Sequence, residues 1–64
     1  MTKFNELIKQ KRKEKKLTQQ EVADAVGITR NYLSDIENGR YNPSFKKSIE
    51  LATFLEIDLN LLYK

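Results

Sequence analysis

The segment from Thr18 to Gly39 limits the possible folds of this chain more than any other part of the sequence. Apolar residues recur in it at helical spacing on both sides of Gly27. Thr18 and Glu21 have the T-x-x-E spacing of a capping box, which marks the beginning of a helix. Gly27 follows the first apolar series directly, where a helix commonly ends on a residue with positive φ. The segment therefore predicts two short helices joined by a tight turn.

The residues between these caps indicate how the two helices cross. Ala23 is small, so a second helix from Arg30 to about Asn38, with Thr29 as its N-cap, can cross closely over the first. Apolar side chains at the inward positions would hold the two helices at a fixed angle: Val22, Val26, Ile28, Leu33 and Ile36. This spacing is that of a helix-turn-helix unit, whose second helix lies in the major groove of DNA.

The size and composition of the chain exclude several other kinds of function. A chain of sixty-four residues is expected to form one domain, residues 1–64. The helical spacing and the helix caps predict that its fold is all-α. The sequence has no Cys and no His, so we expect no thiolate or imidazole metal site, no cofactor and no enzyme activity. No apolar run is long enough to cross a membrane, so the expected location is the cytoplasm, at the nucleoid.

Basic residues are concentrated near the N-terminus. The stretch from Lys9 to Lys16 holds six of the twelve Lys and Arg residues and is opposed only by Glu14. A charge run of this kind is ordinarily a solvated helix face, but it also attracts polyanions such as DNA. The neighbouring helix-turn-helix pattern favours the second interpretation.

The first helix is expected to run from Thr2 or Lys3 to Lys16, with an apolar stripe that ends at Arg12. Arg12 would then lie at the edge of the core, where an unpaired charge is costly. Glu37, next to an inward position of the third helix, is the candidate partner for a structural ion pair. The alternative is that Arg12 extends its guanidinium to water.

A fourth helix is expected after Pro43, with Ser44 as its N-cap. Its predicted buried face consists of Phe45, Ile49, Ala52 and Leu55. Lys46 and Lys47 lie in its first turn, where the helix dipole is unfavourable for cations. Their placement suggests that they face an external anion.

A fifth helix of one turn is expected from Leu59 to Tyr63, with Asp58 as its N-cap. Four of its side chains are apolar, which is more than a terminal turn can bury against its own domain. We therefore expect Leu59, Leu61 and Tyr63 to form a dimer interface.

Longer sequence motifs support the same fold. They are the L-T-Q-x-E-[VL]-A pattern, the V-G-I-T turn, the segment Y-L-S-D-I-E-N-G-R-Y-N-P-S and the closing D-L-N-L-L. With these motifs the chain resembles the Cro and phage-repressor-like (XRE-like) helix-turn-helix family over nearly its whole length. The resemblance implies a compact domain of five helices, a homodimer and a double-stranded DNA operator of two-fold symmetry. Glu56 departs from the family, which usually has Gly there; a Glu at positive φ would cost about 1 kcal/mol, or the helix ends differently.

The outward positions of the third helix are polar and are the predicted base contacts: Arg30, Asn31, Ser34 and Asp35. Ser, Asn and Asp are weak helix formers, so their presence has a reason other than helix stability. Arg30 suits guanine and Asn31 suits adenine, although either can hold a phosphate instead. Ser34 can reach a base edge or a water. Asp35 can accept a hydrogen bond from cytosine N4, or orient one of the two residues that begin the helix.

Other residues are predicted to contact the DNA backbone. Gln19, at the beginning of the second helix, can bind a phosphate through its side chain or its backbone N–H. Tyr32 can pack its ring and offer its hydroxyl to a phosphate. The family resemblance implies four further residues near the backbone: Asn38, Arg40, Tyr41 and Asn42. Arg40 is the main candidate for a phosphate or minor-groove contact.

These features predict a sequence-specific transcriptional regulator, in particular a repressor that binds a palindromic operator as a homodimer through the major groove. No small-molecule ligand is expected. The alternative is a protein-interaction module on the same fold, such as the partner of a toxin or of another regulator. A protein-docking face on the third helix would carry Leu, Met or aromatic residues, whereas this face is polar, which favours DNA.

Overall fold

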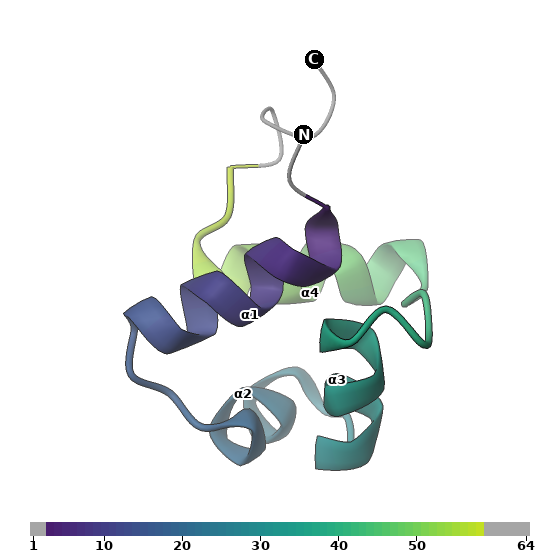
Figure 1. Cartoon of the computed structure of the whole chain (residues 1–64), viewed down its shortest axis with the longest axis horizontal. Helices are drawn as coiled ribbons and strands as arrows, with labels where there is room; N and C mark the ends of the chain where they lie inside the picture. Colours follow the sequence, from purple (N-terminus) through teal and green to yellow (C-terminus); the bar gives the residue numbers. More distant parts are fainter. Residues whose placement is uncertain (1–2, 59–64) are drawn as a thin grey trace.

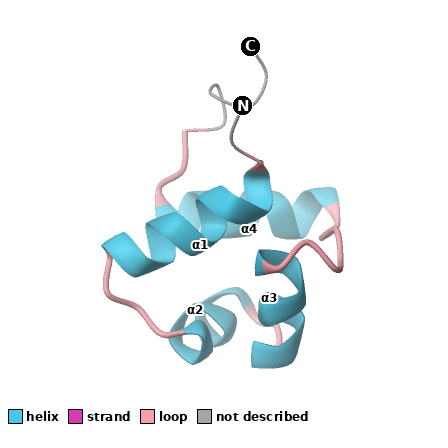
Figure 2. Cartoon of the chain, viewed as in Figure 1, coloured by secondary structure: helices cyan, strands magenta, loops and turns pink. Residues whose placement is uncertain are grey.

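A computed structural model describes residues 3–58 of the chain. Over that range the fold is all-α, as predicted, and contains no strand (Figure 2). The helices are α1 (Phe4–Glu14), α2 (Gln19–Val26), α3 (Arg30–Glu37) and α4 (Phe45–Leu55). The fifth helix expected from Leu59 to Tyr63 lies outside the described residues. None of the helices between residues 3 and 58 is long and apolar enough to cross a membrane.

The four helices form a closed ring of contacts. α1 packs against α3 and α4, and α2 packs against the same two helices. In Figure 1, α1 and α4 lie on one side of the molecule, while α2 and α3 lie on the other. α3 stands at the edge of this arrangement, so one of its faces packs inward and the other is left uncovered (Figure 1).

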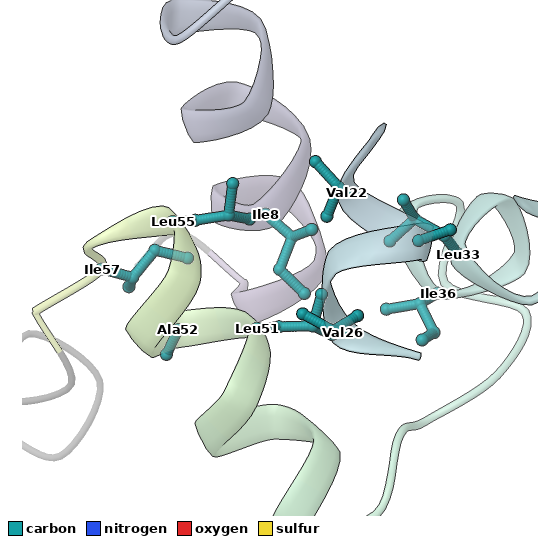
Figure 3. Packing of buried hydrophobic residues seen from close by; sticks show 10 residues of the cluster. Ile8, Val22, Val26, Leu33, Ile36, Leu51, Ala52, Leu55 and Ile57 are labelled. Atoms are coloured by element: carbon teal, nitrogen blue, oxygen red, sulfur yellow. The ribbon is translucent and has the colours of Figure 1, made fainter. Parts of the chain in front are cut away.

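The core is made by side chains from all four helices and by Ile57, which follows α4. Figure 3 shows these side chains meeting, with Ile8 of α1 between those of α4 and α2. The fully buried large side chains are Ile8, Val22, Leu33, Ile36, Leu51 and Leu55. Each contributes about 1.5–3 kcal/mol by leaving water, so a short chain depends on every one of them.

The buried face of α4 differs from the prediction. Ala52 and Leu55 are buried as expected, but Phe45 is 74% exposed and Ile49 is 39% exposed, while Leu51 is fully buried. The helix carries more apolar residues than one face can hold, so periodicity alone selects no single face. The packing of α4 on both α1 and α2 selects the face with Leu51.

The predicted N-caps of α2, α3 and α4 are all confirmed. Thr18 Oγ1 accepts a hydrogen bond from the Glu21 N–H (3.1 Å), and Glu21 Oε1 accepts one from the Thr18 N–H (2.9 Å), which completes the capping box. Thr29 caps α3 and Ser44 caps α4 in the same way, each through its side-chain oxygen.

All four helices end with the same closure. In each case a residue two or three positions after the helix donates its N–H to the carbonyl five residues back, as in a Schellman motif: Leu17 to Arg12, Ile28 to Ala23, Arg40 to Asp35, and Ile57 to Ala52. The residue before each donor has positive φ: Lys16 (58°), Gly27 (75°), Gly39 (74°) and Glu56 (59°). Because Lys16 adopts this conformation, α1 ends at Glu14, two residues before the predicted end.

Replacing Lys16 by Gly should raise the free energy of unfolding by about 0.5–1 kcal/mol, since Gly adopts positive φ without the clash of a Cβ. Urea denaturation followed by circular dichroism measures the change. The matched control is Lys13→Gly, which places Gly inside α1 and should lower stability by about 1 kcal/mol. Equal losses in the two variants would contradict the left-handed closure at Lys16.

Candidate nucleic-acid interface

A buried carboxylate anchors the helix-turn-helix to the rest of the molecule. Glu37 is only 4% exposed although it is charged. Arg12 donates to it twice, from Nε to Oε2 (2.7 Å) and from Nη2 to Oε1 (3.1 Å), and Arg12 Nη1 donates to the Leu17 carbonyl (2.9 Å). The predicted pair is therefore present, and the alternative in which Arg12 only extends to water is wrong. Gln19 Nε2 adds a third hydrogen bond to Glu37 Oε1 (3.0 Å).

This network joins three helices at one point. Arg12 lies on α1, Gln19 begins α2, and Glu37 ends α3. Asn5 adds a hydrogen bond from Nδ2 to the backbone carbonyl of Glu37 (3.3 Å). The side-chain amide of Gln19 is therefore bound within the chain, so the phosphate contact predicted for Gln19 would fall to its backbone N–H.

A second polar contact fixes the turn of the helix-turn-helix. Lys47 Nζ donates to the Val26 carbonyl at the end of α2 (2.7 Å) and to Glu50 Oε2 (2.9 Å). This hydrogen bond lowers the pKa of Glu50, which stays ionised beside the cation. The prediction that Lys47 faces an external anion is thus wrong, because its charge serves the C-terminal end of α2. The position of Lys47 in a first turn did indicate that it needs an anionic or carbonyl partner. The sequence alone does not show that this partner is the Val26 carbonyl, which lies 21 residues earlier.

The uncovered face of α3 carries Arg30 and Asn31 in its first turn, and both side chains are exposed. Ser34 and Asp35 are half-buried one turn further on. Asn38 Nδ2 donates to the Ser34 carbonyl (2.8 Å), so this amide is folded back onto its own helix. The four predicted base contacts therefore lie in the first turn and a half of α3, and the two exposed ones, Arg30 and Asn31, are at its beginning.

The loop after α3 is held against the same helix. The ring centroids of Tyr32 and Tyr41 are 4.9 Å apart, with the rings at 88° to each other. Arg40 Nη1 lies 3.6 Å from Asp35 Oδ1. Asp35 therefore pairs with Arg40 and not with Arg30 or Asn31, which corrects the orienting role predicted for it. The contact between the two tyrosine rings was not predicted, because no local pattern links Tyr32 to Tyr41.

These contacts create one continuous surface from α3 to the loop. An open hollow in it is lined by Thr29, Asn31, Tyr32, Asp35 and Tyr41. Partial burial, and then the neighbouring Tyr41, raise the pKa of the Tyr32 hydroxyl above its ordinary value. Asn42 is exposed at the far end of the loop. Leu59, Leu61 and Tyr63, the predicted dimer interface, lie outside the described residues.

The basic run on and after α1 is partly neutralised within the chain. Lys11 Nζ lies 3.4 Å from Glu14 Oε1, and Lys15 pairs with Glu56. The hydrogen bond from Lys15 lowers the pKa of Glu56. The exposed cations without such a pair are Lys9, Lys13 and Lys16. Among residues 3–58, no cluster of three His, Cys, Asp or Glu side chains could hold a metal ion.

Comparison with known proteins agrees with this geometry. Residues 8–62 match the family model described as helix-turn-helix. The chain belongs to the XRE-type helix-turn-helix family. No solved structure matches it at a significant level.

This chain is similar in sequence to three proteins in particular. The "ImmF control region 10 kDa protein" of Bacillus phage phi105 is 57% identical over 94% of this chain. The "Uncharacterized HTH-type transcriptional regulator YqaE" of Bacillus subtilis (strain 168) is 43% identical over 95% of the chain. The "Immunity repressor protein" of the same phage is 44% identical over 86% of the chain. The matched regions span 67%, 53% and 38% of these three proteins, respectively.

Glu37→Ala should lower the free energy of unfolding by about 3–5 kcal/mol, because it leaves the Arg12 guanidinium buried without its partner. Chemical denaturation measures the loss, and Glu6→Ala, on the exposed side of α1, is the control. Replacing both partners together (Arg12→Met with Glu37→Leu) should restore much of the lost stability. A loss for Glu37→Ala within surface noise, about 0.5 kcal/mol, would refute the structural role of the pair.

Proposed function

We propose that this chain is a sequence-specific DNA-binding protein that represses transcription by occupying promoter DNA. The recognition surface is the uncovered face of α3, which enters the major groove. A regulator of this kind works in the cytoplasm, where it binds operators on the nucleoid.

The observation that carries the proposal is the state of Arg30 and Asn31. Both side chains are exposed, and neither has a hydrogen-bonding partner within residues 3–58. Polar side chains without partners at the beginning of a rigid helix are free to bind base edges. Arg30 is suited to guanine O6 and N7, and Asn31 to adenine N6 and N7. Ser34 and Asp35 add contacts one turn further along.

Affinity that is independent of sequence comes from groups around this face. The backbone N–H of Gln19 begins α2, where orphan donors favour an anion. The hydroxyls of Tyr32 and Tyr41 and the amides of Asn38 and Asn42 are further phosphate contacts in the proposal. Among these proposed phosphate contacts, Arg40 is the one with a positively charged side chain. The exposed lysines of α1 act at longer range and are weakened by salt.

Repression is supported by the names of the relatives. Two of them come from one phage, one named for the ImmF control region and the other named an immunity repressor protein. A chain similar to both fits a role in a phage-type regulatory circuit, in which a repressor blocks a promoter by binding its operator.

The proposed binding unit is a homodimer. Leu59, Leu61 and Tyr63 are apolar residues that follow the described part of the chain. In Figure 1 the chain leaves α4 on the side away from α2 and α3, so pairing through the residues beyond Asp58 keeps both recognition helices free. Two-fold pairing would match a palindromic operator, with half-site centres about 34–36 Å apart.

Arg30→Ala and Asn31→Ala should each weaken binding to the preferred duplex by about one to two orders of magnitude, because a bidentate base contact is lost. Gel-shift titration measures the change, using a duplex enriched from a random pool by the unmodified protein. The melting temperature should stay the same, since neither side chain contacts the core.

The matched control for Arg30→Ala is Lys13→Ala, which removes an exposed cation from α1. Lys13→Ala should weaken binding slightly and equally for all duplexes. Unchanged affinity of both α3 variants for the preferred duplex would rule out α3 as the recognition helix.

A further inference from the structure

Asp35 and Arg40 are joined twice. The Arg40 N–H donates to the Asp35 carbonyl (2.9 Å) as part of the closure that ends α3. Their side chains also pair, with Arg40 Nη1 3.6 Å from Asp35 Oδ1. The main-chain bond fixes the backbone of Arg40 one turn beyond Asp35, so only the two side chains are free to separate. The tyrosine pair that follows holds the loop in place.

The carboxylate of Asp35 is unusual for its position. It lines the hollow on the recognition surface, and it is the one acidic side chain on the uncovered face of α3 within the described residues, since Glu37 is buried. DNA phosphates repel a carboxylate there unless a base offers it a donor. In the major groove that donor is an exocyclic amino group, cytosine N4 or adenine N6.

DNA phosphates attract the guanidinium of Arg40, whereas they repel the Asp35 carboxylate. The side chain of Arg40 is 70% exposed and that of Asp35 is 47% exposed. Such an exposed pair is weak and easily exchanged for other partners. A DNA phosphate can bind Arg40 with two parallel hydrogen bonds. That exchange leaves the Asp35 carboxylate beside the DNA without a counter-charge, unless a base donates a hydrogen bond to it.

We propose that Asp35 and Arg40 form an exchange pair that links base reading to backbone binding. Where the base that faces Asp35 is guanine or thymine, which offer no amino group in the major groove, Arg40 stays on Asp35 and shields its charge. Where cytosine N4 or adenine N6 faces α3, Asp35 accepts its hydrogen bond, and Arg40 turns to a phosphate. Asp35 is then a specificity-determining residue. It acts partly by keeping the Arg40 guanidinium away from the phosphates of duplexes that lack the matching base. This inference rests on the proposed function of α3.

The exchange predicts a specific pattern of salt dependence. Each phosphate contact adds about −0.9 to the slope of log Kobs against log salt concentration. The unmodified protein should therefore show a slope steeper by about 0.9 per subunit on its preferred duplex than on a random-sequence duplex, beyond any other contacts that differ. Asp35→Asn frees Arg40 on every duplex, so the slope on the random-sequence duplex should steepen by about 0.9 per subunit.

The test measures these slopes for four proteins on the two duplexes: the unmodified chain, Asp35→Asn, Arg40→Ala and the double variant. Asp35→Asn should bind random-sequence DNA several-fold more tightly and discriminate less. In the Arg40→Ala background the same change should leave the slope unaltered, since no cation is left to release. Asp24→Asn is the control, because it removes an exposed carboxylate of α2 that accepts only from Gln20.

Two results would overturn the exchange. One is an Asp35→Asn slope on random-sequence DNA that matches the unmodified chain or the Asp24→Asn control. The other is an equal effect of Asp35→Asn with and without Arg40, which would make Asp35 a simple repulsive charge. Both leave DNA binding by α3 intact, whereas an unmodified protein that binds neither duplex would overturn the proposed function and the exchange together.

Discussion

The rest of this fold depends on the hydrogen bonds that the buried Glu37 carboxylate accepts. This carboxylate accepts three hydrogen bonds, two from Arg12 on α1 and one from Gln19 on α2. A buried charge with every oxygen satisfied has few alternative arrangements, because losing any donor leaves it unpaired. The network therefore fixes α3 relative to α1 and α2. The Lys47 bond to the Val26 carbonyl does the same for the turn between α2 and α3.

This division between inner and outer contacts connects structure and function. The inward polar groups Glu37, Gln19 and Lys47 are bound within the chain, which holds α3 in one orientation. The outward groups are either free, as Arg30 and Asn31 are, or held in a weak exposed pair, as Asp35 and Arg40 are. Rigid placement of unbound donors lowers the cost of binding, since little order remains to be imposed.

Local sequence signals predicted the parts of the structure that depend on nearby residues. Thr18 and Gly27 marked the ends of α2 because caps act within one turn. The Arg12–Glu37 pair was also predictable, since a charge at the edge of an apolar stripe requires a partner. The buried face of α4 and the partner of Lys47 were not, because both are set by packing between distant segments. The same holds for the Asp35 pair, which depends on how the chain turns back after α3.

In the proposed function, α3 reads a specific duplex sequence as part of a two-fold symmetric unit. Selection of bound duplexes from a random pool, followed by sequencing, tests it most directly. The expected result is one enriched motif made of two inverted half-sites, with centres about one helical turn, 34–36 Å, apart. Retention of DNA without any enriched motif, or of a single half-site with no symmetry, would contradict it.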